Sequence, residues 1–337
     1  MTSRQRIVLL SAISAAALIV VIVFGTLAYL RSQTALTAPS SVAVIPVTEF
    51  AGDRIEFRNT AAGADYGKVA SVPLDDASGI RSLSSQLCDR VYSTSTLTMC
   101  LTTDAGILTT WTALQIDDTG AHAQSWSLPG VPSRTRISAN SHLVAETSFV
   151  TGISYAGVGF ATETIIATSS GESYGNIENF TLLVDGEQVT AADRNIWGVT
   201  FADDDRHFYA TAASAGSTWL VYGDLVDKTL TSVRGNAECP SLSPDRSRVA
   251  FKKNIGTLNS PDWRIAVLDL TTMAETVLAE ERSVDDQVEW LDDATVLYGL
   301  PRPDVVGDSD VWSLPADGSG APLLFIPHAW SPSVVRP

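Results

Sequence analysis

Short polar turns, each between two apolar strands, recur along most of this chain. They fall near Asp76, Asp118, Ser170, Asp227, Thr271 and Asp317. Their intervals are 42, 52, 57, 44 and 46 residues, and the segments between them are rich in Val, Ile, Thr, Trp and Tyr without helical periodicity. A period of about 40–50 residues in a strand-rich chain is typical of four-stranded propeller blades. Six turns therefore predict an all-β fold, a six-bladed β-propeller.

A second repeated element, an apolar residue followed by an acidic turn and a strand, supports this interpretation. Its copies begin at Phe201, Leu242 and Trp290, with weaker ones at Ile137 and Phe50. A further copy begins at Ala329-Trp330, close to the last residue. We expect this final strand to complete the first blade, because closing the ring removes an exposed sheet edge. A pair of sandwiches and an incomplete barrel are the competing all-β architectures.

The N-terminal segment Ile7–Leu30 contains 24 residues and no charge. About 20 apolar residues suffice to cross a bilayer, whereas the apolar part of a cleaved signal spans about 7–15. Arg4 and Arg6 precede the segment and Arg31 follows it, which weakly favours a cytoplasmic N-terminus. A cleaved signal and a buried globular helix are the alternatives. We predict four parts: a cytoplasmic N-terminus at 1–6, a transmembrane helix at 7–30, a linker at 31–48 and an extracytoplasmic propeller at 49–337.

The charge balance limits the partners of this chain. It has 22 Lys and Arg against 38 Asp and Glu, a net charge of −16. The first 31 residues contain three Arg and no acid, so the remainder carries 19 basic and 38 acidic residues. A nucleic-acid-binding protein needs a basic footprint, so we expect no nucleic-acid partner. An acidic outer domain is also repelled by anionic lipid headgroups.

Two of the three cysteines are placed to form a disulfide. If 93–95 forms a three-residue turn, Cys88 faces Cys100 on antiparallel strands. Directly opposed residues have Cα atoms about 4.5–5.5 Å apart, within disulfide range, and an oxidising compartment favours the bond. We predict this disulfide; two buried thiols are the alternative. We interpret Cys239 as a small buried hydrophobic residue, because no His lies near it in sequence.

Two runs resemble the WD40-like propeller repeats of the TolB family, namely CPSLSPDRSRVAF at 239–251 and WRIAVLDL at 263–270. The wider pattern resembles membrane-anchored TolB-like proteins of actinobacteria at Cys88–Tyr92, Trp197–Phe201, Ser283–Asp293 and Asp317–Pro322. The resemblance covers about residues 50–335 and implies a six-bladed propeller outside the cytoplasm. TolB itself is a protein-binding component of an envelope complex. This chain has an apolar anchor and no sign of TolB's separate N-terminal α/β domain, so the Tol partners do not carry over.

The run Gly171-Glu172-Ser173-Tyr174-Gly175 matches the nucleophile elbow of hydrolases. That elbow needs a helix after the Ser and a later Asp and His in a doubly wound sheet. Here the following segment has the pattern of a loop and a strand, and propeller repeats occupy the rest of the chain. Ser173 falls on the hairpin turn expected of the third blade, so we predict no catalytic residue. No Walker loop or complete dinucleotide-binding fingerprint occurs, and no cofactor is expected.

Metal-binding patterns are weak. His122, His142, His207 and His328 are scattered singly, without zinc-ligand spacing. The acidic clusters are Asp203–Asp205, Asp285–Asp286, Asp292–Asp293, and Asp308 with Asp310. Calcium prefers carboxylate oxygens, but several of these acids lie on repeat turns, where Asp caps its own backbone. We therefore predict solvated turns and no metal site.

The eight tryptophans are Trp111, Trp126, Trp197, Trp219, Trp263, Trp290, Trp312 and Trp330. Some recur at equivalent repeat positions, which favours packing between blades. A sugar- or peptide-binding face is the alternative.

Taken together, these patterns favour a membrane-anchored, non-enzymatic scaffold that binds an envelope protein. The alternatives are an enzyme acting on envelope carbohydrate or a metabolite in the propeller channel, and a ligand-binding sensor. A channel mouth lined by convergent acids and His would favour the enzyme, and an apolar loop rim would favour protein recognition.

Overall fold

The computed structural model describes residues 3–37, 39–46, 50, 52–106, 108–150 and 161–337. Helix α1 (Ser3–Thr37) contains the segment Ser3–Leu27, which has a mean hydropathy of 3.0 and is not buried. That segment is long and apolar enough to cross a membrane, as an anchor or as part of a signal sequence. The helix continues past Leu30, so the first part of the segment predicted as a linker at 31–48 is helical. The helix and the propeller belong to separate compact units.

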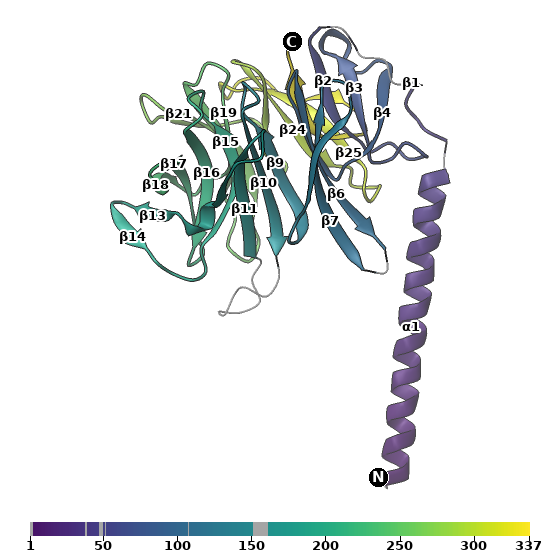
Figure 1. The fold of residues 1–337 in the computed structure, drawn as a ribbon. Coiled ribbons are helices and arrows are strands. Elements are labelled where there is room, and N and C mark those ends of the chain that lie inside the picture. The colour runs from purple at the N-terminus through teal and green to yellow at the C-terminus, as the bar shows by residue number, and fades with distance from the viewer. Residues whose placement is uncertain (1–2, 38, 47–49, 51, 107, 151–160) are drawn as a thin grey trace. The chain divides into compact units, whose positions relative to one another are not determined.

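The strands form six sheets arranged as the blades of a propeller (Figure 1). We name the strands of each blade A to D from the centre outward; each A strand packs against the A strand of the next blade. Blade 1 contains β27 (Ala329–Val335), β2 (Arg54–Asn59), β3 (Lys68–Pro73) and β4 (Arg81–Leu87), with β1 (Val44–Pro46) outside. Blade 2 contains β5 (Arg90–Ser93), β6 (Leu97–Ala105), β7 (Thr109–Asp117) and β8 (His122–Ser127). Blade 3 contains β9 (Val131–Ile137), β10 (Leu143–Val150), β11 (Ala161–Thr168) and β12 (Ser173–Asn176).

The second half of the ring follows the same order. Blade 4 contains β15 (Asn195–Phe201), β16 (His207–Ser214), β17 (Ser217–Asp224) and β18 (Thr229–Gly235). Blade 5 contains β19 (Glu238–Leu242), β20 (Arg248–Asn254), β21 (Trp263–Asp269) and β22 (Glu275–Val277). Blade 6 contains β23 (Glu289–Asp292), β24 (Thr295–Pro301), β25 (Ser309–Pro315) and β26 (Leu323–Ile326). All six predicted turns join a C strand to a D strand, which confirms the six-bladed fold.

The ring closes as the sequence predicts. The last strand, β27, is the A strand of blade 1 and pairs antiparallel with β2, with Arg54 opposite Val335. The buried guanidinium of Arg81 supports this closure: its Nη1 donates to Asn59 Oδ1 (2.7 Å) and to the His328 carbonyl (2.9 Å). Burial lowers the pKa of Arg81 to about 10. Arg81 thus links two strands of blade 1 to the residue just before β27.

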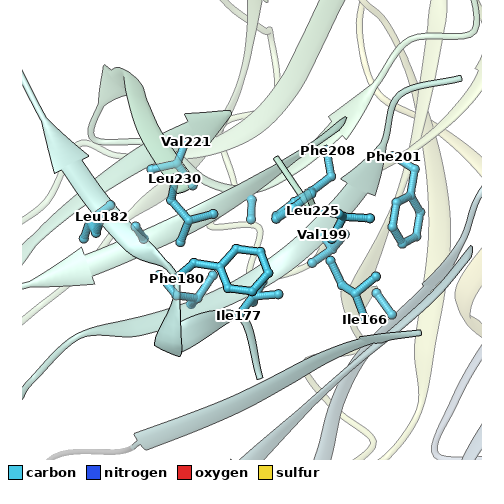
Figure 2. Close-up of a cluster of buried hydrophobic side chains, with 14 of the residues drawn as sticks. Ile166, Ile177, Phe180, Leu182, Val199, Phe201, Phe208, Val221, Leu225 and Leu230 are labelled. Carbon is cyan, nitrogen blue, oxygen red and sulfur yellow. The ribbon is translucent and has the colours of Figure 1, made fainter. Parts of the chain in front are cut away.

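Blade 4 carries an additional hairpin, β13 (Thr181–Val184) and β14 (Glu187–Val189). Strand β13 pairs in parallel with β18, so this sheet has six strands. The short 3₁₀ turn η2 (Ile177–Asn179) leads into it; a similar turn, η1 (Leu74–Asp76), lies in blade 1. Ile177 and Phe180 belong to the apolar cluster between blades 3 and 4. Figure 2 shows this cluster, which also contains Phe208. Burial of these large side chains stabilises the hairpin by about 2 kcal/mol each.

The predicted disulfide between Cys88 and Cys100 is present, with the Cα atoms 5.3 Å apart. The predicted strand register is wrong: Cys100 lies opposite Val91, not opposite Cys88. Burial explains the shift, because in the observed register the core side chains of β6, including fully buried Met99, face inward. Cys88 therefore precedes β5, and the bond links that connection to β6. In the chain-entropy model such a link contributes about 3 kcal/mol.

Candidate functional site

The two faces of the propeller carry different loops. All A strands begin on the face where B strands are joined to C strands, and we call this the BC face; its loops include residues 215–216, 255–262 and 302–308. The opposite AB face carries the turns from A to B and from C to D. Because loops on a rigid scaffold commonly bind partners, each face is a candidate interface.

Exposed apolar side chains gather on the BC face. At the tips of its loops the exposed fraction is 81% for Leu108, 75% for Leu258 and 105% for Val306. Val131 and Phe149, at strand ends of blade 3, are also exposed on this face. Single exposed apolar residues are ordinary, so it is their number on the loops of this face that makes the BC face the stronger candidate interface.

A cavity of about 1150 Å³ opens on the BC face at blades 4 and 5. Its walls come from β15 to β18, from the connection between β14 and β15, and from the first three strands of blade 5. The start of β11 in blade 3 and the turn η2 complete the lining. Leu258 lies at its rim and approaches blade 4: a methyl group placed on Gly216 would be 3.4 Å from Leu258 Cδ1. Among the described residues that line it there is no His, Cys or Lys.

Two irregular positions in neighbouring A strands shape the inner wall of the cavity. Gly198 in β15 has φ +68°, and Cys239 in β19 has φ +49°. A Cβ on Gly198 would lie only 2.8 Å from the Cys239 Cα, so the two backbones meet where only glycine fits. Both strands shift register at these points. The bulges place the adjacent side chains of Trp197 and Glu238 in the cavity wall.

Three carboxylates line the cavity. Glu178 accepts a hydrogen bond from Thr162 Oγ1 (2.5 Å), and burial raises its pKa. Glu238 is 9% exposed, and burial raises its pKa although Lys252 Nζ lies 3.7 Å away. Asp193 accepts hydrogen bonds from Ser214 Oγ (2.6 Å) and the Ala215 backbone N–H, and these lower its pKa.

Arg194, the cationic residue among the described lining residues, donates hydrogen bonds to backbone carbonyls. Arg194 donates from Nε to the Ala191 carbonyl (3.1 Å) and from Nη1 to the Val189 carbonyl (3.2 Å). These two bonds hold the guanidinium against the backbone of the connection between β14 and β15 and the end of β14. The lining therefore carries more negative than positive charge.

Some tryptophans pack between blades, and others lie in the cavity lining, where a binding face was the alternative. Trp290 is 3% exposed and belongs to the core shared by blades 5 and 6, as predicted. Trp197, Trp219 and Trp263 line the cavity instead, and the last two are only partly buried. The sequence could not distinguish the two groups, because the cavity depends on bulges and on the extra hairpin of blade 4.

An ion pair crosses the centre of the ring. Arg136 of blade 3 contacts Glu289 of blade 6, and both side chains are less than a tenth exposed. The guanidinium also donates to the Val288 carbonyl (3.2 Å) and lies 4.5 Å from the ring centroid of Tyr92. The Tyr92 hydroxyl donates to Glu289 Oε1 (3.3 Å). This cluster forms the floor of a pocket of about 240 Å³ that opens on the AB face.

A second charged layer lies on the BC side of this ion pair. Lys252 Nζ contacts Asp285 (2.5 Å), and the amide of Gly299 donates to Asp286 (3.0 Å). Arg90 stacks near Trp330, 5.6 Å from its ring, and burial lowers the pKa of Arg90 to about 10. Acidic and basic side chains therefore lie close together in this layer.

The other sequence candidates lie away from the cavity. The hairpin turn of blade 3 lies just before Ser173, which was predicted on the turn itself and instead begins β12. Its Oγ accepts from the Gly175 amide (3.0 Å). His142 and His207 lie on AB-face turns beside Asp205 and Asp204. Cys239 is buried, as predicted.

The acidic clusters cap turns or form ion pairs. Asp204 accepts from the His207 amide (2.8 Å) and Asp292 from the Ala294 amide (2.8 Å). On the BC face, Asp308 contacts His328 Nδ1 (2.7 Å), and Asp310 contacts Arg302 (2.9 Å). No group of three or more His, Cys, Asp or Glu suited to a metal ion occurs within the described part of the chain. His122 is exposed on β8.

Comparisons with solved structures identify the fold. TolB from Acinetobacter baumannii matches with a TM-score of 0.59 and 15% identity, covering 85% of this chain and 67% of that one. The propeller is TolB-like. A chain of a nidogen–laminin complex matches this TolB-like propeller with a TM-score of 0.54 and 10% identity, covering 84% and 98%. A puromycin-hydrolysing peptidase of Mycobacterium tuberculosis matches with 0.49 and 15%, covering 87% and 47%. No family model and no curated protein matches the chain.

Proposed function

We propose that this protein is a membrane-anchored, non-enzymatic scaffold of the cell envelope, and that its propeller binds a partner protein through the BC face. The observation that carries the proposal is the set of exposed apolar loop residues on that face, with Leu258 at the rim of the large cavity. A rim of this kind favours recognition of a protein surface.

Two further observations support the proposal. Helix α1 is long and apolar enough to hold the chain in a membrane. One of the propellers that this chain resembles was solved in a protein–protein complex, nidogen with laminin.

Capture from cells tests the proposal. The tagged full-length protein is crosslinked in the cells it comes from and purified as wild type, Leu258→Asp and Val226→Asp. Leu258 and Val226 are both exposed, at 75% and 66%, but on opposite faces. We expect a dominant envelope protein whose recovery falls at least tenfold in Leu258→Asp, because the substitution removes apolar contact area at the rim and adds a carboxylate that must be dehydrated on binding. Equal recovery with both variants, or no partner above background, would contradict the proposal.

A further inference from the structure

We propose that the BC-face cavity binds a basic polypeptide segment, with a Lys or Arg side chain inserted between its tryptophans and carboxylates. The inference rests on the proposed function, since it names the chemistry of the partner segment. The cavity, of about 1150 Å³, is large enough for one or two side chains.

The negative charge of the cavity lining favours a cationic ligand. Glu178, Asp193 and Glu238 face the cavity, while Arg194 is held by backbone carbonyls. Lys252, just behind the wall, is already paired with Asp285 (2.5 Å). An acidic segment would be repelled here, and a cation would gain ion pairs in a partly dehydrated site.

The aromatic lining suits the same group. A Lys or Arg head is attracted to the face of a Trp ring, and its aliphatic stem packs on apolar surface. Trp263 already shows this chemistry, because Lys252 Nζ lies 4.5 Å from its ring centroid. Trp219 and Trp197 provide further ring surface, and Leu258 and Pro261 provide apolar surface at the rim.

We expect Glu178 and Glu238 to make binding at this site depend on pH. Burial raises the pKa of both Glu178 and Glu238. The charged neighbours of Glu178 include Glu163, and those of Glu238 are Lys252, Asp285 and Arg134. A bound cation favours the ionised form of both carboxylates, so its binding should strengthen as pH rises from 5 to 8.

Synthetic peptides test the inference without a known partner. The probes are the heptapeptide Gly-Arg-Gly-Arg-Gly-Arg-Gly with blocked termini and its counterpart with citrulline, a neutral isostere, at each Arg position. Binding to the full-length protein in detergent micelles is followed by tryptophan fluorescence and calorimetry. We expect the Arg peptide to bind at least tenfold more tightly than the citrulline peptide, and its affinity to fall as salt is raised.

Variants locate the site. Glu178→Gln and Glu238→Gln should each weaken binding of the Arg peptide about fivefold or more, and Glu172→Gln, an exposed glutamate on a blade 3 turn, should not change it. Thermal unfolding confirms that the variants fold. Equal affinity for both peptides, no binding of the Arg peptide, or binding unaffected by both cavity variants would overturn the inference. If that happens while Leu258→Asp still abolishes capture, the scaffold proposal stands and only the basic character of the partner is wrong.

Discussion

Replacing Glu289 with Gln will lower the free energy of unfolding by about 3–5 kcal/mol, because the buried Arg136 guanidinium then lacks its counter-ion. Glu289 and Arg136 are 7% and 6% exposed and join blades on opposite sides of the ring. Arginine does not lose its proton at accessible pH. The variant therefore cannot relieve its buried charge by titration, and its loss of stability relative to wild type is measured by chemical unfolding of the full-length protein in micelles at pH 8.

The partner variant should behave differently. Arg136→Met leaves Glu289 buried without its cation, but a carboxylate can take up a proton, so this variant should regain stability as pH falls. The double variant Arg136→Met with Glu289→Leu should recover most of the loss, because apolar residues of similar volume often replace a buried ion pair at little cost. A double variant that is less stable than both single variants would contradict an electrostatic origin.

Glu146→Gln will stabilise the protein above pH 7 and leave its stability near pH 4.5 almost unchanged. Burial raises the pKa of Glu146 from 4.5 to about 7; the Trp126 indole N–H, which donates to Oε1 (2.7 Å), opposes this shift, and Glu163 adds to it. The folded state therefore holds the proton more tightly than the unfolded state. The contribution of Glu146 to the free energy of unfolding is fully present below its unfolded pKa of 4.5. It is lost as pH rises from there through the folded pKa of about 7, by about 3 kcal/mol in total.

Glutamine retains an acceptor for Trp126 and cannot ionise, so the variant avoids this loss. Unfolding free energies of wild type, Glu146→Gln and the exposed control Glu172→Gln are compared at pH 4.5, 6 and 8. The difference between Glu146→Gln and wild type should grow with pH, while the control follows wild type. A difference independent of pH would show that the pKa of Glu146 is the same in the folded and unfolded protein, and would contradict the raised pKa.

The blade count and the ring closure could be predicted from the sequence because each turn is a local signal and its spacing repeats. The disulfide partners could also be predicted. The register beside them could not, because burial of Met99 and its neighbours, not the turn residues, decides it.

The candidate site lies beyond what such local patterns contain. The cavity wall depends on a glycine in one blade meeting Cys239 of the next, and Cys239 takes a backbone conformation that its residue type does not suggest. The ion pair across the channel joins residues 153 positions apart. Sequence spacing carries no sign of either contact.

The most direct test of the account places a photo-crosslinking amino acid in the full-length protein, in living cells, at Leu258 on the BC face or at Val226 on the AB face. We expect position 258 to capture one dominant envelope protein and position 226 not to capture it. The crosslinked segment of the partner should contain Lys or Arg. Capture of the same protein from position 226 but not from position 258 would contradict the assignment of the BC face.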